Sequence, residues 1–296
     1  MLIPYMDLLA EARAGGYAVG YFEAWDIYSL EAVLDAAEAE GKPIILGFGG
    51  VMMEPGWFED RGMERLGALG LATAKSARVP VSLLLNEVST FSQVVRGIQA
   101  GFNAVMLETS SLPFAENVRL TRKVVEVAHA AGVGVEGELG TLPDATGETD
   151  GHESSQTDPE EAGRYVSETG IDALSVSIGN VHILTSGKAQ IDLDRLAAIH
   201  KNVAIPLVIH GGTGFPEEAI PQALALGVAK FNIGTLLKQA FFDGVASAIS
   251  DLPPAPSIQQ VMGSRKETDI LQQGKLRMRQ AIVQRMRAWD PAQLGR

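Results

Sequence analysis

Eight short apolar segments, each ending in turn or polar residues, recur along the 296-residue chain. They occupy residues 17–23, 43–49, 80–87, 102–108, 133–140, 173–179, 206–212 and 228–234. Segments with helical spacing of apolar residues separate them, at 28–41, 61–77, 90–101, 114–131, 158–170, 192–201, 216–227 and 235–250. Near-continuous apolar strands that alternate with helices are typical of a parallel sheet buried on both faces. Eight such units predict an α/β fold, the closed (β/α)8 TIM barrel.

The length agrees with one large domain, because a barrel of this class uses about 250 residues. We therefore predict one barrel domain over residues 1–296, in which 251–296 form a C-terminal helical extension. The extension begins with the Pro-rich DLPPAP and continues as one long helix over 258–288. A polar segment, 141–157, follows the fifth strand and is expected to form a loop over the mouth of the barrel.

Composition narrows the classes of function. The 24 Lys and Arg residues stand against 36 Asp and Glu, which gives a formal net charge of −12, and there is no cysteine. The missing cysteines exclude disulfides, thiolate metal ligands and a cysteine nucleophile. An acidic chain without a basic stripe argues against nucleic acid and anionic membranes as partners. Without a leader pattern or a run of about 18 apolar residues, we expect a cytoplasmic protein that binds a small molecule.

Polar side chains follow most of the predicted strands, at the end of a barrel where catalytic residues lie. They are Glu23, Asn86, Glu87, Glu108, Glu136, Glu138, Asn180, His182, His210 and Asn232. Two interpretations stay open, a shared metal or acid–base site and simple capping of the helices at this rim. Two histidines on consecutive strands, His182 and His210, would form a divalent-metal site with Glu87.

Glycine-rich turns follow the seventh and eighth predicted strands. Gly211, Gly212 and Thr213 lead into one helix, and Asn232, Ile233, Gly234 and Thr235 lead into the next. Backbone N–H groups at helix N-termini attract anions, and these two loops form the usual phosphate site of this barrel class. The pattern favours a phosphorylated substrate, and ordinary glycine-rich turns are the alternative interpretation.

Several ordered motifs carry a resemblance to one family. They are AGGYAVGYFE, VMLETSSLPFAENVRLTRKVVEVAH, VGVEGELG, TGIDALSVSIGNVH, PLVIHGGTG and VAKFNIGT, spread over residues 3–250. Together they resemble the class II, metal-dependent fructose-bisphosphate/tagatose-bisphosphate aldolases. The resemblance implies a zinc-type barrel, a homo-oligomer and a lyase of carbohydrate metabolism. Such an enzyme cleaves or forms a carbon–carbon bond in a phosphorylated ketose through a metal-stabilised enediolate.

The resemblance also assigns roles to particular residues. His182 and His210 match two of the three histidine ligands of the family, and Glu87 stands at the third position. Glu108 and Glu138 match acidic positions beside the metal. The positions that hold the dihydroxyacetone-phosphate part of the substrate are matched by Gly211, Gly212, Thr213, Asn232, Gly234 and Thr235, of which Asn232 would contact the enediolate.

The chain departs from the family pattern at the end of the third strand. The family has an Asp-His pair there, and this chain has Asn86 and Glu87. An amide cannot exchange a proton near neutral pH, so Asn86 would orient an aldehyde oxygen by hydrogen bonding. A carboxylate ligand favours Mn²⁺, Fe²⁺ or Mg²⁺ more than a third histidine would, and Zn²⁺ stays open. The proton transfers would then fall to Glu148 in the polar loop or to Glu23.

Three hypotheses follow. The first is a divalent-metal aldolase that acts on a phosphorylated ketose other than the usual bisphosphates, because Glu23 would repel a second phosphate. The second is a non-catalytic aldolase paralogue that serves as a binding or partner subunit. The third is an ordinary bisphosphate aldolase with an unusual site. Metal binding separates the first from the second, and release of triose phosphate from bisphosphates separates the first from the third.

Overall fold

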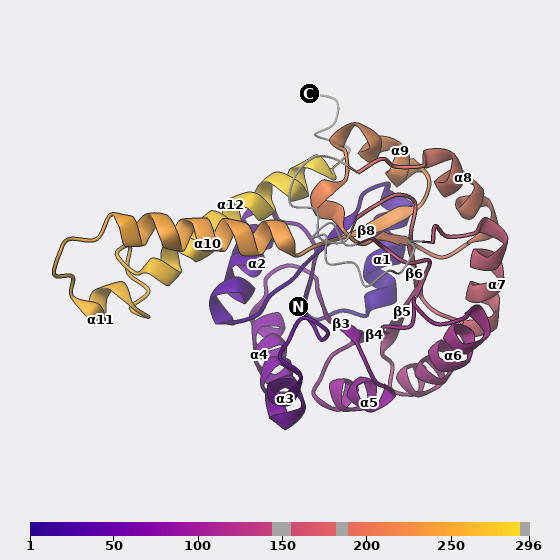
Figure 1. The fold of residues 1–296 in the computed structure, drawn as a ribbon, viewed down its shortest axis with the longest axis horizontal. Coiled ribbons are helices and arrows are strands. Elements are labelled where there is room, and N and C mark those ends of the chain that lie inside the picture. The colour runs from indigo at the N-terminus through magenta and orange to yellow at the C-terminus, as the bar shows by residue number, and fades with distance from the viewer. Residues whose placement is uncertain (144–154, 182–188, 291–296) are drawn as a thin grey trace.

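The computed structural model describes residues 1–143, 155–181 and 189–290 of the chain. Eight parallel strands close into a barrel in sequence order, and β8 pairs with β1. They are β1 (Val19–Phe22), β2 (Ile44–Gly49), β3 (Val81–Val88), β4 (Ala104–Leu107), β5 (Gly134–Leu139), β6 (Ala173–Val176), β7 (Leu207–Ile209) and β8 (Val228–Ile233). Every residue in these strands is buried, as the continuous apolar runs predict. The predicted (β/α)8 barrel is confirmed, and Figure 1 shows it as a ring of strands inside a ring of helices.

The surrounding helices agree with the predicted ones to within two residues, apart from the segment before β8. They are α2 (Ile27–Glu40), α4 (Met63–Ser76), α5 (Phe91–Gln99), α6 (Phe114–Ala130), α7 (Pro159–Thr169), α8 (Leu193–Asn202) and α10 (Thr235–Ser250). Local side-chain chemistry starts several of them. Asp26 and Ser29 form a reciprocal capping box at α2, and Thr90 and Gln93 form one at α5. Each box satisfies backbone N–H groups that a helix start leaves without partners.

The segment before β8 is less regular than predicted. In place of one helix over 216–227, the chain forms η2 (Gly212–Gly214), η3 (Glu217–Ala219) and the short α9 (Ile220–Ala225). Pro216 precedes η3 and a second proline lies in the first turn of α9, so the backbone N–H groups for one continuous helix are missing. A short α3 (Pro55–Trp57) and the wide turn η1 (Phe58–Gly62) also precede α4.

An additional helix, α1 (Tyr5–Gly15), closes the end of the barrel opposite the polar strand ends. The sequence alone did not predict it. Its buried side chains Tyr5, Leu8, Leu9 and Ala12 pack against inward-facing strand residues such as Leu84. A larger apolar cluster fills the space between the strands and the outer helices. The barrel interior is therefore a packed core rather than a channel.

The C-terminal segment forms two helices, α11 (Ile258–Val261) and α12 (Ile270–Ala288), so the prediction of one helix over 258–288 is wrong. The break lies where Gly263 and Arg265 adopt positive φ values of 72° and 61°. Helix α12 runs along α10 and α2, and the paired helices project from the barrel in Figure 1. Trp289 anchors this arm, because its ring stacks on Phe22 and Phe231. None of the described helices is long and apolar enough to cross a membrane.

Candidate active site

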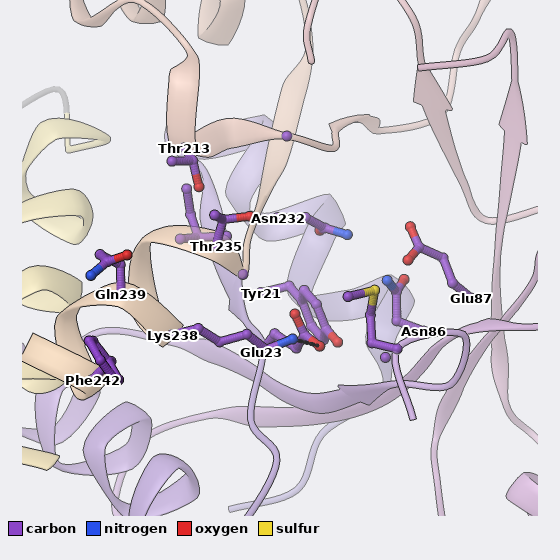
Figure 2. A pocket seen from close by; sticks show the side chains of 15 residues that line it. Tyr21, Glu23, Asn86, Glu87, Thr213, Asn232, Thr235, Lys238, Gln239 and Phe242 are labelled. Atoms are coloured by element: carbon purple, nitrogen blue, oxygen red, sulfur yellow. Dashed lines mark hydrogen bonds and ion pairs between the residues drawn. The ribbon is translucent and has the colours of Figure 1, made fainter. Parts of the chain in front are cut away.

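A pocket of about 380 Å³ lies at the carboxyl ends of the strands. Its walls come from the ends of β1, β2, β3 and β8, from the loop after β7 and from the first turns of α10. The polar residues that line it are Tyr21, Glu23, Asn86, Glu87, Thr213, Asn232, Thr235, Lys238 and Gln239. Figure 2 shows these side chains converging from segments far apart in the sequence. This is the end of the barrel at which we expected the site.

Two consecutive residues of β3, Asn86 and Glu87, both line the pocket. In a regular strand, neighbouring side chains point to opposite faces of the sheet. Here the pairing of β3 with β4 shifts register between Leu85 and Val88, and Glu87 has a positive φ of 50°. A positive φ is uncommon for a residue with a side chain, and bulges of this kind re-aim side chains next to active sites. The bulge thus brings both polar groups to one site.

His210, which directly follows β7, lies among three carboxylates from neighbouring strands. Its Nδ1 is 2.9 Å from Oε1 of Glu87 and 3.5 Å from Oε1 of Glu138, and its Nε2 is 2.8 Å from Oε1 of Glu136. Burial alone would lower the pKa of His210, but Glu138, Glu136 and Glu87 outweigh it and raise the pKa to about 10. The backbone carbonyl of His210 accepts a hydrogen bond from Asn180, which holds this residue in place.

Lys230 of β8 lies on the other side of Glu136 and is fully buried. Its Nζ is 2.6 Å from Oε2 of Glu136, which also accepts a hydrogen bond from the hydroxyl of Tyr5. Burial opposes ionisation of Glu136, but Lys230 and His210 outweigh it and lower the pKa of Glu136 to about 2. An ionised Glu136 therefore binds His210 through Nε2, which leaves Nδ1 facing Glu87 and Glu138.

A second cleft of about 550 Å³ adjoins the first and shares Glu87 as a wall. Glu108 and Glu138 also line it, so three carboxylates face this part of the mouth. Oε1 of Glu138 accepts a hydrogen bond of 3.0 Å from Ser175. Burial raises the pKa of Glu138 to about 8. The charge of His210 lowers this pKa, and the charges of Glu108 and Glu87 raise it further. Burial and the neighbouring carboxylates oppose ionisation of Glu138, and a bound cation would relieve both effects.

The opposite wall of the pocket is suited to an anion. Gly211 lies there in the left-handed conformation at φ 66°, followed by Thr213. Helix α10 begins at Thr235 after Gly234, which has no side chain to cap the first N–H groups. Uncapped N–H groups at a helix start attract negative charge. Lys238 in the first turn also lines the pocket.

Glu23 is not an isolated carboxylate in this pocket. Its Oε1 is 3.1 Å from Nζ of Lys238, and Figure 2 shows the lysine reaching toward it. The side chain of Glu23 is 11% exposed and that of Lys238 is 39% exposed. The ion pair neutralises much of the charge that we expected Glu23 to present.

Three buried polar atoms that face the pocket have no hydrogen-bond partner within the described residues. They are the hydroxyl of Tyr21 and the Oδ1 atoms of Asn86 and Asn232. Burial raises the pKa of Tyr21 well above its ordinary value, and Glu23 and Glu87 add to that effect. Tyr21 therefore keeps its proton at neutral pH. Because buried polar groups in proteins are nearly always hydrogen-bonded, three orphans in one pocket indicate a place for a polar ligand.

The structure brings most of the predicted site residues together. Asn86, Glu87, Gly211, Thr213, Asn232, Gly234 and Thr235 line one pocket. Gly212 lies against the backbone of Asn232, and His210 is in contact with Glu87. Glu108 and Glu138 line the adjoining cleft. The predicted ligand His182 and the predicted loop carboxylate Glu148 lie outside the described residues, and the described part of the chain holds no group of three or more side chains arranged as a metal site.

Sequence reasoning missed Lys238 and Gln239 at the start of α10, and it also missed Tyr21 and Lys230. A lysine in the middle of the apolar run VAKFNI was a usable signal, because a charged residue in a fully buried strand requires a buried partner. Tyr21 gave no such signal, since tyrosine is common in strands. Glu136 was one of the candidates at the strand ends, but its pairing with both His210 and Lys230 follows only from the three-dimensional structure.

Comparisons with known proteins agree with this geometry. The family model for class-II fructose-bisphosphate aldolase matches residues 3–293. A fructose-bisphosphate aldolase from Geobacillus stearothermophilus is 36% identical over 268 residues, which cover 90% of this chain and 92% of that protein. The chain belongs to the class-II fructose-bisphosphate aldolase family. The resemblance seen in the sequence motifs is therefore confirmed.

Solved structures of the family share the fold. The crystal structure of the YdjI aldolase from Escherichia coli K12 matches with a TM-score of 0.82 at 27% sequence identity. The match covers 98% of this chain and 97% of that one. Members of this aldolase family are lyases, so the family supports an enzyme that breaks or forms a carbon–carbon bond.

Proposed function

We propose that this protein is a metal-dependent aldolase that cleaves or forms a carbon–carbon bond in a phosphorylated ketose. The observation that carries the proposal is one pocket with two unlike walls. Glu87 lines one wall, with Nδ1 of the buried His210 2.9 Å from its Oε1, and the glycine-rich loop after β7 and the start of α10 form the other. A substrate with a ketone for the first wall and a phosphate for the second spans the pocket.

The donor atoms described here fit a divalent ion. With metal–ligand bonds of about 2.0–2.2 Å, two ligand atoms on one ion lie roughly 3–3.6 Å apart. The separation from Nδ1 of His210 to Glu138 is 3.5 Å, within this range, and that to Glu87 is 2.9 Å, just below it. Glu136 occupies Nε2 of His210, an arrangement in which a carboxylate orients a histidine ligand. We propose Glu87 and His210 as ligands, with His182 as the third and Glu108 and Glu138 beside them. A bound ion would take the place of the proton on Nδ1 of His210.

The bound ion would polarise the ketone carbonyl and stabilise negative charge on its oxygen. Imidazole and carboxylate ligands suit Zn²⁺, Mn²⁺ and Fe²⁺, and Mg²⁺ suits a site richer in carboxylates. The chain's own residues do the rest. Asn232 lies on β8 between the two walls and presents an unpartnered amide oxygen to the hydroxyl next to the ketone. Glu148 is the proposed carboxylate that moves protons from the polar loop.

The anion wall selects for one phosphate. Gly211 and Thr213 from one loop and Thr235 from the start of α10 offer backbone and hydroxyl donors within the pocket. Lys238, the one cation among the described residues that line the pocket, is paired with Glu23. We therefore propose a ketose with one phosphate next to the ketone and an uncharged aldehyde portion. With that cation already paired, the described residues of the pocket leave no free positive charge for a second phosphate.

Metal content tests this proposal first. Elemental mass spectrometry of protein purified without a metal-affinity tag is expected to find about one divalent ion per chain. His210→Ala and the isosteric Glu87→Gln are expected to lose it, and His200→Ala, in α8 outside the site, is the control. The loaded protein is then assayed for triose-phosphate release from ketose 1-phosphates. Protein that holds no metal and takes up none of Zn²⁺, Mn²⁺ or Fe²⁺ would instead be a non-catalytic paralogue.

A further inference from the structure

Of the three unpartnered polar groups in the pocket, one can donate a hydrogen bond and two present acceptors. The donor is the hydroxyl of Tyr21, and the acceptors are the Oδ1 atoms of Asn86 and Asn232. Tyr21 is 2% exposed and Asn86 is 3% exposed, so bulk water does not satisfy either group. Both line the same pocket, and Figure 2 shows the side chains of Tyr21, Asn86 and Asn232 in this part of it.

The path of the Tyr21 ring is set by a glycine in the next strand. Tyr21 pairs in register with Asn232 of β8 on one side and with Ile45 of β2 on the other. A Cβ at Gly47 of β2 would lie 2.0 Å from the backbone oxygen of Leu84 and 2.9 Å from Cε2 of Tyr21. The ring thus lies close against β2 where that strand has no side chain, on the side of the barrel that leads to β3 and Asn86. A side chain at position 47 would displace it.

The two groups together are complementary to a hydroxyl. A hydroxyl has one O–H to donate and lone pairs to accept. Its hydrogen would go to Oδ1 of Asn86, and its oxygen would accept the O–H of Tyr21. A phosphate or carboxylate oxygen has no hydrogen for Asn86, so an anion leaves the amide oxygen unpartnered. This corner of the pocket therefore selects a neutral hydroxyl.

We propose that Tyr21 is a catalytic residue that binds, together with Asn86, the ketose oxygen that becomes the aldehyde oxygen on cleavage. The inference rests on the proposed aldolase function. A ketose whose phosphate lies on the loops after β7 and β8 extends toward β2 and β3. Carbons beyond the ketone then reach the corner formed by Tyr21 and Asn86.

Tyr21 forms and breaks no covalent bond in this role. As the carbon–carbon bond forms or breaks, negative charge grows on the aldehyde-derived oxygen, and a donated hydrogen bond to that oxygen strengthens. The family pattern has an acid–base residue at the position of Asn86, which an amide cannot replace for proton transfer. Tyr21 supplies the donor that holds the oxygen while another group moves the proton.

The variant Tyr21→Phe removes only the hydroxyl and keeps the ring that packs against β2. We expect the rate of condensation of dihydroxyacetone phosphate with glyceraldehyde to fall about 100-fold. Exchange of the dihydroxyacetone-phosphate α-hydrogen with D₂O, followed by NMR, is expected to stay within about twofold of wild type, because that half of the reaction involves no aldehyde. Metal content is expected to stay unchanged and Tm to stay equal or rise, because an unpartnered hydroxyl is removed.

The control is Tyr28→Phe, a buried tyrosine outside the pocket whose hydroxyl donates to Asp269 at 3.2 Å. It should lower Tm slightly and leave both rates unchanged. Normal condensation by Tyr21→Phe would overturn the inference and leave the aldolase proposal standing. Loss of exchange as well as condensation would also overturn it, by placing the hydroxyl at the ketone. If the metal-loaded wild type shows neither reaction, the proposed function itself fails, and this inference fails with it.

Discussion

Two groups of buried polar residues lie close together near the carboxyl ends of the strands. They differ in whether their polar atoms have hydrogen-bond or ion-pair partners. In the cluster around His210, each of His210, Glu136 and Lys230 has a charged neighbour at 2.6–2.9 Å. In the group formed by Tyr21, Asn86 and Asn232, each has a polar atom without a partner inside the described structure. Exposure does not explain the difference, since all six side chains are at most 8% exposed.

The difference indicates two roles: the paired group holds a site residue in position, and the unpartnered group binds the substrate. A network of paired buried charges has a single well-defined geometry, and breaking it leaves a charge without compensation. Unpartnered buried groups cost free energy in the empty protein, about 1–3 kcal/mol each, and regain it when a ligand supplies the missing bond. The cluster thus holds His210, the proposed metal ligand, in position. The amides of Asn86 and Asn232 and the hydroxyl of Tyr21 would gain hydrogen bonds only when substrate binds.

The largest effect is expected from breaking the paired cluster at Lys230. Lys230→Met leaves Glu136 buried with one cation fewer, and such losses typically cost about 3–5 kcal/mol. We expect a decrease of that size in the free energy of unfolding, measured by urea denaturation. We also expect metal affinity to fall about 10–100-fold, because Glu136 orients His210.

The double variant Lys230→Met with Glu136→Gln is the control for this prediction. It removes the uncompensated charge, so much of the lost stability should return. Metal affinity should not return, because a neutral glutamine orients His210 less strongly than a carboxylate. A single Lys230→Met variant as stable as wild type would show that the pairing at 2.6 Å carries little energy in the folded protein.

The next effect is expected on catalysis rather than stability. Asn232→Ala removes an amide whose oxygen has no partner in the described structure, so the free energy of unfolding should change by less than about 1 kcal/mol. The turnover number should fall about 10²–10³-fold, as it does when one donor or acceptor aimed at the reacting atoms is lost. Steady-state kinetics beside a urea titration measure both. A variant that loses stability and keeps turnover would place Asn232 with the paired cluster.

Asn86→Asp changes an unpartnered acceptor into a group that can exchange protons. We expect turnover to rise at least about tenfold, because general acid–base groups typically contribute 10²–10⁴-fold. Stability should fall by roughly 1–3 kcal/mol, since a further carboxylate is buried beside Glu87. Asn86→Ser, which cannot carry the charge, is the matched control. Unchanged turnover in the aspartate variant would mean that Asn86 does not stand at the acid–base position.

The sequence was sufficient for the barrel because its strands are buried on both faces. Burial on both faces produces apolar runs such as VSLLLNEV, which can be read without knowing any neighbour. The strand ends then followed from topology, so Glu87, His210 and Asn232 could be named as candidates. The class of fold therefore fixed which positions of the chain meet.

Features that depend on neighbours could not be predicted. The bulge that turns Glu87 into the pocket arises from pairing with β4, and the helix break near Gly263 has no proline to announce it. The charge of Glu23 was predicted to repel phosphate. Its partner Lys238 is 215 residues away in the sequence, so the ion pair between them could not be predicted. Periodicity reports burial, and it does not report which polar groups find partners.

The pair of Glu23 and Lys238 is charged and paired, like the cluster around His210, but it lines the pocket like the unpartnered group. Breaking it should give the smallest effect on stability. The pair is partly exposed, and such pairs contribute about 0–1 kcal/mol to stability. Glu23→Gln should therefore change the free energy of unfolding by less than about 1 kcal/mol. Its effect should appear in specificity. With Lys238 released, KM for a ketose 1,6-bisphosphate should fall severalfold, and KM for a ketose 1-phosphate should not change. Lys238→Met should raise KM for the bisphosphate instead. Equal changes for both substrates would mean that the pair does not face the aldehyde end of the ketose.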